Sequence, residues 1–541
     1  MKFGVACATV GLILGGSVMA GAWEKALDER VDAAKDAQVK AVQEVIAIKS
    51  YNHGSPTTPS EGVKQALDAM LAMAEKMGMR TTKHPDYRYG YVEIGPENAP
   101  EMVMVLGHLD TVPEGNPDLW TLGSPFEGKI VEGKIVGRGA TDDKGPCVAA
   151  LYALKAINEA QIPLERRIRL FFGTSEDGAG DDELSWSCVE TYAALCREGK
   201  EEWPTLGFSP DSGSFSVTYI EKTGVNVLGN LKLGAPGAVK LAALKGGSAR
   251  NAVSDLCSVV FEAADEAGAE ALAAAVAGAL TQEPWKGDVT VKVTGKTVSC
   301  DVIGVAAHSG QAWKGKNANV RTLFLMSRVG PEETWGKHAA KLVELIGVDV
   351  ADGAALGIKQ GDPKPDDNIT VNMGLVGLKS ADVDPTLTFH VNIRYPGEGA
   401  DLKVPDIKHY TGAELREKVA EAFRQKGFEV GDGKEVALTG GAKPYTVPWD
   451  SEIVTKLRQA YAKSSGKDLE PEIVFGGTYA SAWQNEPVDD KGTLFGYRMA
   501  AWGIEGGGGE HEPNEYLTID GMMQSTKVLA RAMASLGGAK E

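Results

Sequence analysis

Histidine and acidic side chains follow an apolar segment in the first quarter of this chain. The run from Val103 ends at Gly107, and His108 and Asp110 come next, two residues apart. Residues with this spacing leave a β-strand on the same face, so both side chains would point to one side of the strand end. Imidazole nitrogen and carboxylate oxygen are common ligands of divalent metal ions. A single pair of this kind is more often structural, so the interpretation depends on acids elsewhere in the chain.

Three more segments end on acids, and a glycine run near the C-terminus ends on a histidine. The residues concerned are Asp142, Glu176, Asp177, Asp211 and His511. A capping turn would explain Asp142 alone, and a flexible linker would explain the glycine run before His511. Like charges that pack side by side repel one another, however, unless a cation lies between them. Together the residues indicate a cation site at the carboxyl ends of buried strands.

The set matches the ligands that a hydrolase with two metal ions needs. Two divalent ions roughly 3.5 to 4 Å apart are well held by a bridging carboxylate, with one histidine and one terminal carboxylate for each ion. The pattern predicts Asp142 as the bridge, His108 with Asp211 on one ion, and His511 with Asp177 on the other.

Two acids remain outside this ligand set. Asp110 would accept a hydrogen bond from the far nitrogen of His108 and so fix the tautomer of the ring. Glu176 would act as general base on the water between the metals. The sequence therefore predicts hydrolysis by a water that two metal ions activate.

Length and charge restrict the architecture and the partners. A chain of 541 residues exceeds the size of one hydrophobic core, so two domains are expected. Its net charge of -18 argues against a nucleic-acid or anionic-membrane partner, because few cations are available to neutralise phosphates. A small-molecule substrate is the remaining expectation.

The first 22 residues have the pattern of a cleaved export signal. Lys2 supplies the positive end, Phe3 to Leu14 the apolar run, and Ala20-Gly21-Ala22 a small-residue cleavage site. An N-terminal core helix is the alternative. The run is too short for a membrane span, so none is expected in the mature chain. We expect an exported, periplasmic protein, in which Cys257 and Cys300 could pair in an oxidising compartment.

The apolar periodicity predicts the elements that must position these residues. Helical spacing over 26–48 and 63–77 alternates with strand-like runs, which predicts an α/β fold with a mostly parallel sheet covered by helices. From Gly224 the pattern changes, and the clustered acids are missing for about one domain length. We therefore expect a catalytic domain formed by residues 23–223 and 436–541, with an inserted α+β lid domain over 224–435.

Five motifs in order resemble the co-catalytic zinc metallopeptidases of the aminoacylase, carboxypeptidase G and carnosinase family. They are Gly-His-Leu-Asp-Thr-Val-Pro, Gly-Arg-Gly-x-x-Asp-Asp-Lys-Gly-Pro, the acidic pair of Gly-Thr-Ser-Glu-Asp, Ser-Pro-Asp, and the late Glu-His-x-x-Asn-Glu. The resemblance covers nearly the whole mature chain. The insertion and the segments around Asn251, His308, Arg394 and Gly477-Thr478 are most similar to the PepV-type Xaa-His dipeptidase branch.

This resemblance implies roles for the lid and for the substrate site. It makes His308 the oxyanion donor, and it makes Asn251 and Arg394 contacts to the carboxylate end of a peptide substrate, with Gly477 and Thr478 also at the substrate. It implies two divalent ions, zinc first and manganese or cobalt next. It also implies a monomer, in which the enlarged lid takes the place of a partner. Because His308 and Arg394 are far in sequence from the metal candidates, the lid must fold over the site.

The sequence departs from the family pattern at two positions. Asp177 stands where the family usually has Glu, which should change geometry more than charge. Ser481 stands where the dipeptidases commonly carry Arg, and this bears on substrate specificity.

Three functions fit these observations to different degrees. A metal-dependent dipeptidase is the first, and an N-acyl amino-acid deacylase with the same chemistry is the second, since both substrates offer a free carboxylate to Arg394. A non-catalytic binding protein on a hydrolase scaffold is the third. The presence of Glu176 argues against the third, because a binding protein has no need of a general base.

Overall fold

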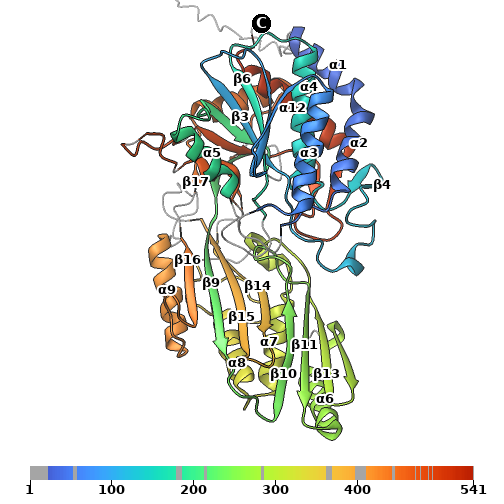
Figure 1. Cartoon of the computed structure of the whole chain (residues 1–541), viewed down its shortest axis with the longest axis vertical. Coiled ribbons are helices and arrows are strands. Elements are labelled where there is room, and N and C mark those ends of the chain that lie inside the picture. The colour runs from blue at the N-terminus through green and yellow to red at the C-terminus, as the bar shows by residue number, and fades with distance from the viewer. Residues whose placement is uncertain are drawn as a thin grey trace, which may run out of the picture.

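The fold was analysed in a computed structural model. It describes residues 22–52, 58–177, 186–211, 216–281, 286–360, 368–396, 410–441, 445–469, 471–474, 477–484, 486–489, 491–496 and 498–539. The predicted export signal lies outside the described residues, apart from Ala22, where the first helix begins. The described chain forms two bodies, one above the other in Figure 1, each built around its own sheet.

The first body contains a sheet of nine strands within the described residues. The strands are β1 Arg80–Lys83, β2 Tyr89–Ile94, β3 Met102–His108, β6 Arg167–Gly173, β7 Leu206–Ser209, β8 Val217–Glu221, β17 Tyr445–Thr446, β18 Pro471–Val474 and β19 Met499–Trp502. The neighbours β6, β3, β7 and β19 run parallel, and most of the outer pairs are antiparallel. This confirms the predicted α/β class, with the parallel part at the centre of the sheet.

Helices cover this sheet. They are α1 Ala22–Ala33, α2 Lys35–Ile46, α3 Glu61–Lys76, α4 Lys144–Glu159, α5 Ser187–Arg197, α10 Glu452–Ser465, α11 Tyr479–Gln484 and α12 Ile519–Leu536, with the short turn η1 Pro117–Leu119. In α3 the residues Val63, Leu67 and Met70 are buried, because apolar residues three or four apart share one face of a helix. Helix α4 is buried over most of its length between β3, β6 and α12.

The second body contains an antiparallel sheet of eight strands, again counted over the described residues. The strands are β9 Thr223–Lys232, β10 Val239–Gly246, β11 Leu256–Ala263, β12 Val289–Thr294, β13 Thr297–Ile303, β14 Thr370–Lys379, β15 Thr386–Tyr395 and β16 Val436–Gly440. The helical segments are α6 Glu266–Leu280, η2 Lys286–Asp288, η3 Ser309–Lys314, α7 Ala318–Val329, α8 Thr334–Ile346 and α9 Gly412–Gln425. This α+β body is the lid domain.

The lid sheet extends slightly past the predicted limits of the insertion. Strand β9 begins at Thr223, and β16 pairs with β9 up to Gly440, whereas the sequence suggested residues 224 and 435. The next strand, β17, already belongs to the first sheet. The short strand β16 is hard to detect from sequence because Thr439, Gly440 and Gly441 make its end look like a turn.

A small third sheet joins distant parts of the catalytic domain. It consists of β4 Lys129–Val131, β5 Lys134–Val136, β20 Gly507–Gly508 and β21 Tyr516–Thr518. Strand β21 pairs with β5, so the turn that leads to Asp142 lies beside the segment that carries His511.

The cysteines give a correction. All five cysteines of the described residues are free and buried, so Cys257 and Cys300 do not pair. They lie on adjacent strands, but Cys257 is opposite Val302 and Cys300 is opposite Val259. The side chains are therefore diagonal neighbours and not a directly facing pair, a relation that sequence spacing does not reveal. Among the described helices, none has the length and apolarity to cross a membrane.

Candidate metal centre and active site

Strand β3 ends at His108, and the position before it has little space. A Cβ atom on Gly107 would lie 2.4 Å from Cys147 Sγ and 2.5 Å from an oxygen of Asp143, both at the start of α4. Glycine therefore lets α4 approach the strand end. The backbone N–H of His108 donates to Asp143 Oδ2 at 3.0 Å, which ties the strand end to the turn before α4.

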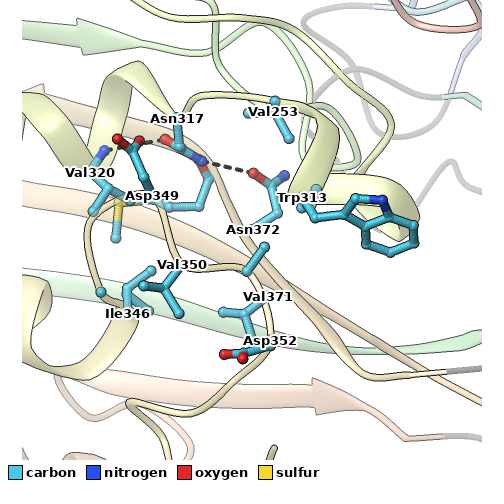
Figure 2. A pocket seen from close by; sticks show the side chains of 15 residues that line it. Val253, Trp313, Asn317, Val320, Ile346, Asp349, Val350, Asp352, Val371 and Asn372 are labelled. Carbon is cyan, nitrogen blue, oxygen red and sulfur yellow. Dashed lines mark hydrogen bonds between the residues drawn. The ribbon is translucent and has the colours of Figure 1, made fainter. Parts of the chain in front are cut away.

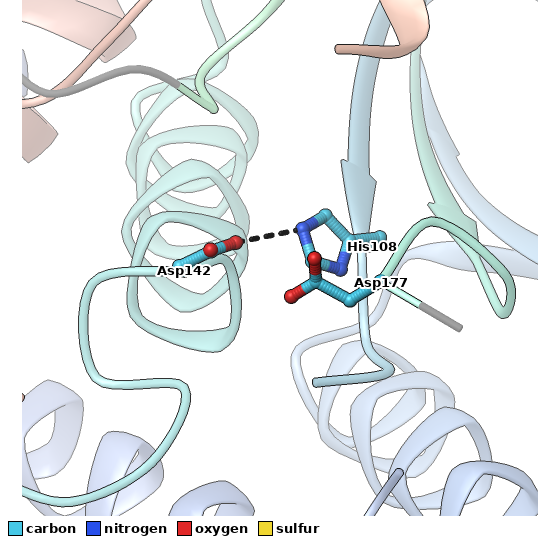
Figure 3. A group of neighbouring side chains, drawn as sticks. All are labelled: His108, Asp142 and Asp177. Atoms are coloured by element: carbon cyan, nitrogen blue, oxygen red, sulfur yellow. Dashed lines mark hydrogen bonds and ion pairs between the residues drawn. The ribbon is translucent and has the colours of Figure 1, made fainter. Parts of the chain in front are cut away.

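Asp142 lies between two histidines. Its Oδ1 is 3.0 Å from His108 Nε2, and its Oδ2 is 3.0 Å from His511 Nε2. Figure 3 shows Asp142 directed at His108 from the turn before α4, with Asp177 on the near side of the ring. A carboxylate that offers one oxygen to each of two histidines has the arrangement that the sequence predicts for a bridging ligand.

The other predicted ligands lie around these two histidines. Asp177 Oδ1 is 3.2 Å from His511 Nε2, and Asp211 Oδ2 is 3.8 Å from His108 Nε2. Asp177 is thus beside His511 and Asp211 beside His108, although a ligand atom of Asp177 also lies within 4.8 Å of one on His108. Glu176 Oε2 also lies 3.8 Å from His108 Nε2, at the same distance as Asp211.

The electrostatics of the cluster fit a bound cation. Burial, followed by the charges of Asp143 and Asp142, raises the pKa of Asp211 well above its usual range. Burial, with the neighbouring Asp177 and Asp142 as further causes, likewise raises the pKa of Glu176. One buried oxygen of Asp177 has no hydrogen-bond partner.

The donor set is consistent with this electrostatic picture. Ligand atoms of His108, Asp142 and Asp177 lie within 4.8 Å of one another, and so do those of His108, Glu176 and Asp211. Divalent ions would neutralise these acids, and the oxygen of Asp177 that has no hydrogen-bond partner would be one of their ligands. Histidine nitrogen mixed with carboxylate oxygen suits zinc and related transition ions.

Asp110 has a broader role than the predicted one. Its carbonyl oxygen is the nearest partner of His108 Nδ1, at 2.8 Å, and its carboxylate oxygen lies 3.5 Å away. The carboxylate accepts hydrogen bonds from the backbone N–H groups of Glu176 and Asp177 at 3.0 and 3.1 Å. Asn52 Nδ2 donates to it at 3.2 Å. Asp110 therefore orients His108 chiefly through its backbone, and its side chain holds the loop that presents Glu176.

A buried ion pair that the sequence analysis missed joins the two ligand loops. Glu515 accepts hydrogen bonds from Arg138 Nη1 at 2.7 Å and from the N–H groups of Thr141 and Asp142 at 2.9 and 3.1 Å. Glu515 follows His511 by four residues, so one carboxylate fixes both the Asp142 turn and the His511 segment. The signal was present, since Glu515 is the last residue of the Glu-His-x-x-Asn-Glu motif.

The lid brings Asn251 and His308 to the cluster. The segments that carry them pair with each other, with Ser309 N–H donating to Asn251 O at 2.8 Å. The ring of His308 lies 5.0 Å from the ring of His511, centre to centre. Asn251 Nδ2 is 3.4 Å from Asp177 Oδ1. The lid of the same chain thus covers the metal candidates.

The protonation of His308 follows from its surroundings. Gly310 N–H donates to His308 Nδ1 at 3.1 Å, so Nδ1 acts as an acceptor. Burial, followed by the charges of His511 and Arg394, lowers the pKa of His308 well below its usual range. The ring is neutral, and its proton therefore resides on Nε2, which is left to donate.

Arg394 lies near the end of β15 and faces the same cluster. Burial lowers the pKa of Arg394, while the charges of Glu176 and Asp177 act in the opposite direction and favour its charged form. Arg394 Nε donates to Asn392 Oδ1 at 2.9 Å, which leaves the two terminal nitrogens of the guanidinium as the remaining donors.

Thr478, a predicted substrate contact, bonds to another residue of the protein through both of its donors. Its N–H and its hydroxyl both donate to the buried carboxylate of Glu221, each at 2.7 Å. Neither donor is left for a substrate. Gly477 packs on the ring of Trp186, and the hydroxyl of Ser481 donates to Thr478 O at 2.8 Å. The family signal at this turn could not reveal Glu221, which is distant in sequence.

Comparison with known proteins decides the family. The model of a family described as Peptidase family M20/M25/M40 matches residues 104–212 and 235–535. The chain belongs to this family. Membership confirms the predicted enzyme class, a metallopeptidase, and the resemblance at the level of the family.

Relatives in this family match over most of their length. The chain is 29% identical to "Putative dipeptidase YtjP" of Bacillus subtilis, over 93% of this chain and 97% of the relative. A Staphylococcus aureus relative with the same description, SAB1611c, is 29% identical over 94% of this chain and 98% of its own.

Two solved structures share the fold. Human carnosine dipeptidase 1 is 16% identical with a TM-score of 0.54, covering 96% of this chain and 99% of its own. The dipeptidase Dug1p of Saccharomyces cerevisiae is 12% identical with a TM-score of 0.55 and the same coverage of 96% and 99%. At these identities the similarity concerns the fold, and it confirms the catalytic body with an inserted lid.

Proposed function

We propose that this chain is a metal-dependent exopeptidase that hydrolyses dipeptides. The observation that carries the proposal is the meeting of two sets of residues at one place. Asp142 is shared by His108 and His511 on the catalytic side, while His308 and Arg394 approach the same acids from the lid. Such a site offers cation ligands, a base, an oxyanion donor and a carboxylate anchor together.

The residues that would hold two divalent ions are those with matching donors. Asp142 would bridge, His108 and Asp211 would complete one site, and His511 and Asp177 the other. When bound, the ions would polarise the scissile carbonyl and make water more acidic. Zinc is our first choice for both positions, with manganese or cobalt as alternatives.

Glu176 is the base of the proposed reaction. Its carboxylate lies 3.8 Å from His108 Nε2, and its own backbone is fixed by Asp110. From this position it would take a proton from the attacking water and deliver it to the amine that leaves. The carboxylate group can do both because it is not needed in the proposed ligand set.

His308 and Arg394 would bind the two ends of the scissile residue pair. The Nε2–H of His308 would donate to the oxygen that becomes negative as the carbonyl is attacked. The terminal nitrogens of Arg394, with the amide of Asn251, would bind the free carboxylate of the substrate. One residue separates these two groups in a dipeptide, which matches two lid residues on neighbouring segments.

The relatives support the dipeptide assignment over deacylation. Both relatives are described as dipeptidases, and the two solved structures are those of dipeptidases. Within the family we place the chain beside the PepV-type branch, because its own lid supplies His308. The site is complete in one chain, and we therefore infer a monomer. The pattern of residues 1–22 supports export to the periplasm.

The test is a substrate panel after removal and return of metal. The chelated protein should be inactive, and zinc, manganese or cobalt should restore cleavage of dipeptides above that of N-acyl amino acids. Preferential cleavage of N-acyl amino acids would replace the proposal with deacylation. Absence of turnover with every metal and substrate, in folded protein, would leave a binding function instead.

A further inference from the structure

Three asparagines lie side by side across the lid sheet. Asn226 on β9 is opposite Asn392 on β15, and Asn392 is opposite Asn372 on β14. Directly opposed residues of antiparallel strands point to the same face of a sheet, so the three amides form a row. We call these residues the asparagine row. Asn372 and Asn392 are buried, with 1% and 4% of their surface exposed.

Asn392 connects two of the lid residues that face the acids. Its Oδ1 accepts hydrogen bonds from Arg394 Nε at 2.9 Å and from Ser309 Oγ at 2.9 Å. Its Nδ2 donates to Asn226 Oδ1 at 2.8 Å. Ser309 directly follows His308, so one amide oxygen holds both the Arg394 side chain and the turn that carries His308.

Asn372 supports the third lid residue in the same way. Its Nδ2 donates to Ala252 O at 2.9 Å and to Arg250 O at 3.4 Å, on either side of Asn251. Its Oδ1 accepts from Asn317 Nδ2 at 2.8 Å, a bond drawn in Figure 2. Asn317 and Asn372 also line a cavity of about 340 Å³ in the lid. The row thus connects the sheet to all three lid residues of the proposed site.

We propose that Asn392 is a positioning residue that fixes the separation between the carboxylate anchor Arg394 and the oxyanion donor His308. The inference rests on the proposed function, because the separation of Arg394 and His308 matters only if both bind the same dipeptide. In a dipeptide the scissile carbonyl and the terminal carboxylate are a fixed, short distance apart. An anchor and a donor that moved independently would seldom meet both groups at once.

Only an amide satisfies the contacts of this position. Asn392 accepts two hydrogen bonds at one end and donates one at the other, which a carboxylate cannot do and an apolar residue of similar shape does not do. Loss of the side chain would leave buried donors of Arg394 and Ser309 without their acceptor. Arg394 would then be free to turn toward Glu176 and Asp177, whose charges already act on it.

Asn392→Ala and Ser309→Ala test the inference, with Thr388→Val as the matched control. Thr388 lies on the same strand, and its hydroxyl donates to Gly377 O at 3.2 Å, away from the lid residues of the site. Each variant is assayed as the metal-loaded full chain on a dipeptide and on its C-terminally amidated analogue. Metal content and the thermal midpoint are measured alongside.

We expect Asn392→Ala to lose about tenfold to hundredfold in kcat/KM on the dipeptide, as for a lost hydrogen bond to a charged group. KM should rise because Arg394 is no longer held in place to bind the carboxylate. The value of kcat should fall because the turn that carries His308 is no longer held in place. The amidated analogue should show the kcat part only. Ser309→Ala, a milder change, should lower kcat with little effect on KM. Thr388→Val should change neither constant by more than about twofold, as expected for a site outside the network.

A double mutant separates positioning from general damage to the lid. In an Arg394→Ala background, Asn392→Ala should no longer raise KM, because the anchor it serves is gone. Equal effects of Asn392→Ala and Thr388→Val, or a KM increase that persists without Arg394, would overturn the inference. If Arg394→Ala and His308→Ala themselves leave the kinetics unchanged, it is the proposed function that fails. If Asn392→Ala does not fold, the Ser309→Ala split between kcat and KM decides the question.

Discussion

Replacement of His308 by alanine isolates the contribution of the lid to the chemistry. The ring is neutral, and its Nδ1 already accepts the N–H of Gly310 at 3.1 Å, so Nε2–H is the single donor that the ring can offer. The substitution removes this donor. It leaves the proposed ligands unchanged, since within the described residues no hydrogen bond joins His308 to them and its contact with His511 is between the two rings.

The expected loss is that of one preorganised oxyanion donor. Such donors are worth about 10²- to 10³-fold in kcat, or about 3 to 4 kcal/mol of transition-state stabilisation. The effect on folding should be smaller, because the native state loses one hydrogen bond to Gly310, worth about 1 kcal/mol. Catalysis should therefore fall far more than stability, and the two effects can be told apart.

The assay compares kcat for the metal-loaded wild-type and His308→Ala proteins on the same dipeptide. Metal content and thermal unfolding are measured on the same samples. His338→Ala is the matched control, since His338 is also a partly buried lid histidine. It stacks on Phe428 at 6.1 Å and lies on α8, far from the catalytic sheet in Figure 1.

The reasoning is refuted by either of two results. A kcat within a few-fold of wild type in His308→Ala, with full metal content, would exclude the lid histidine from the reaction. An equal loss in His338→Ala would show that kcat reports on the condition of the lid and not on a donor at the site.

Three further outcomes follow from the same geometry. Glu176→Gln should keep both metal ions and lose nearly all turnover, because it removes the base and spares the ligands; retained activity with verified metal content would exclude Glu176 as the base. Asp142→Ala should lower the occupancy of both ions, since each histidine faces one of its oxygens, and two full equivalents by metal analysis would contradict the bridge. Arg394→Ala should raise KM for dipeptides with a free carboxylate by about tenfold or more, as expected for the loss of a charge-assisted pair. The KM for amidated analogues should rise less. Equal increases for both substrates would make Arg394 structural.

The proximity of the predicted metal ligands could be predicted because each lies at the end of a strand that the local sequence pattern reveals. A parallel strand delivers the residue after its carboxyl end to one edge of the sheet, whatever the distance in sequence. His108 is the last residue of β3, Asp177 and Asp211 follow the ends of β6 and β7, and these strands are neighbours. The helical and strand-like periodicities therefore sufficed for the fold class and for the assembly of these residues.

The contacts that hold the site were not predictable in the same way. Asn392 lies two residues before Arg394, and strand alternation alone would have placed both on one face. Its meeting with Asn226 and Ser309, however, depends on the register of β9 with β15 and on the placement of η3, which the sequence does not specify. Glu515 ends one of the family motifs, yet its bond to Arg138 requires the small sheet that joins β5 to β21.

The hydrogen bonds of Thr478 show how the two bodies are joined. Glu221 is the last residue of β8, and the first lid strand begins at Thr223. The chain thus enters the lid directly after a buried carboxylate that takes both donors of Thr478. The turn that the family resemblance assigns to the substrate therefore also ties the start of α11 to the point where the chain enters the lid.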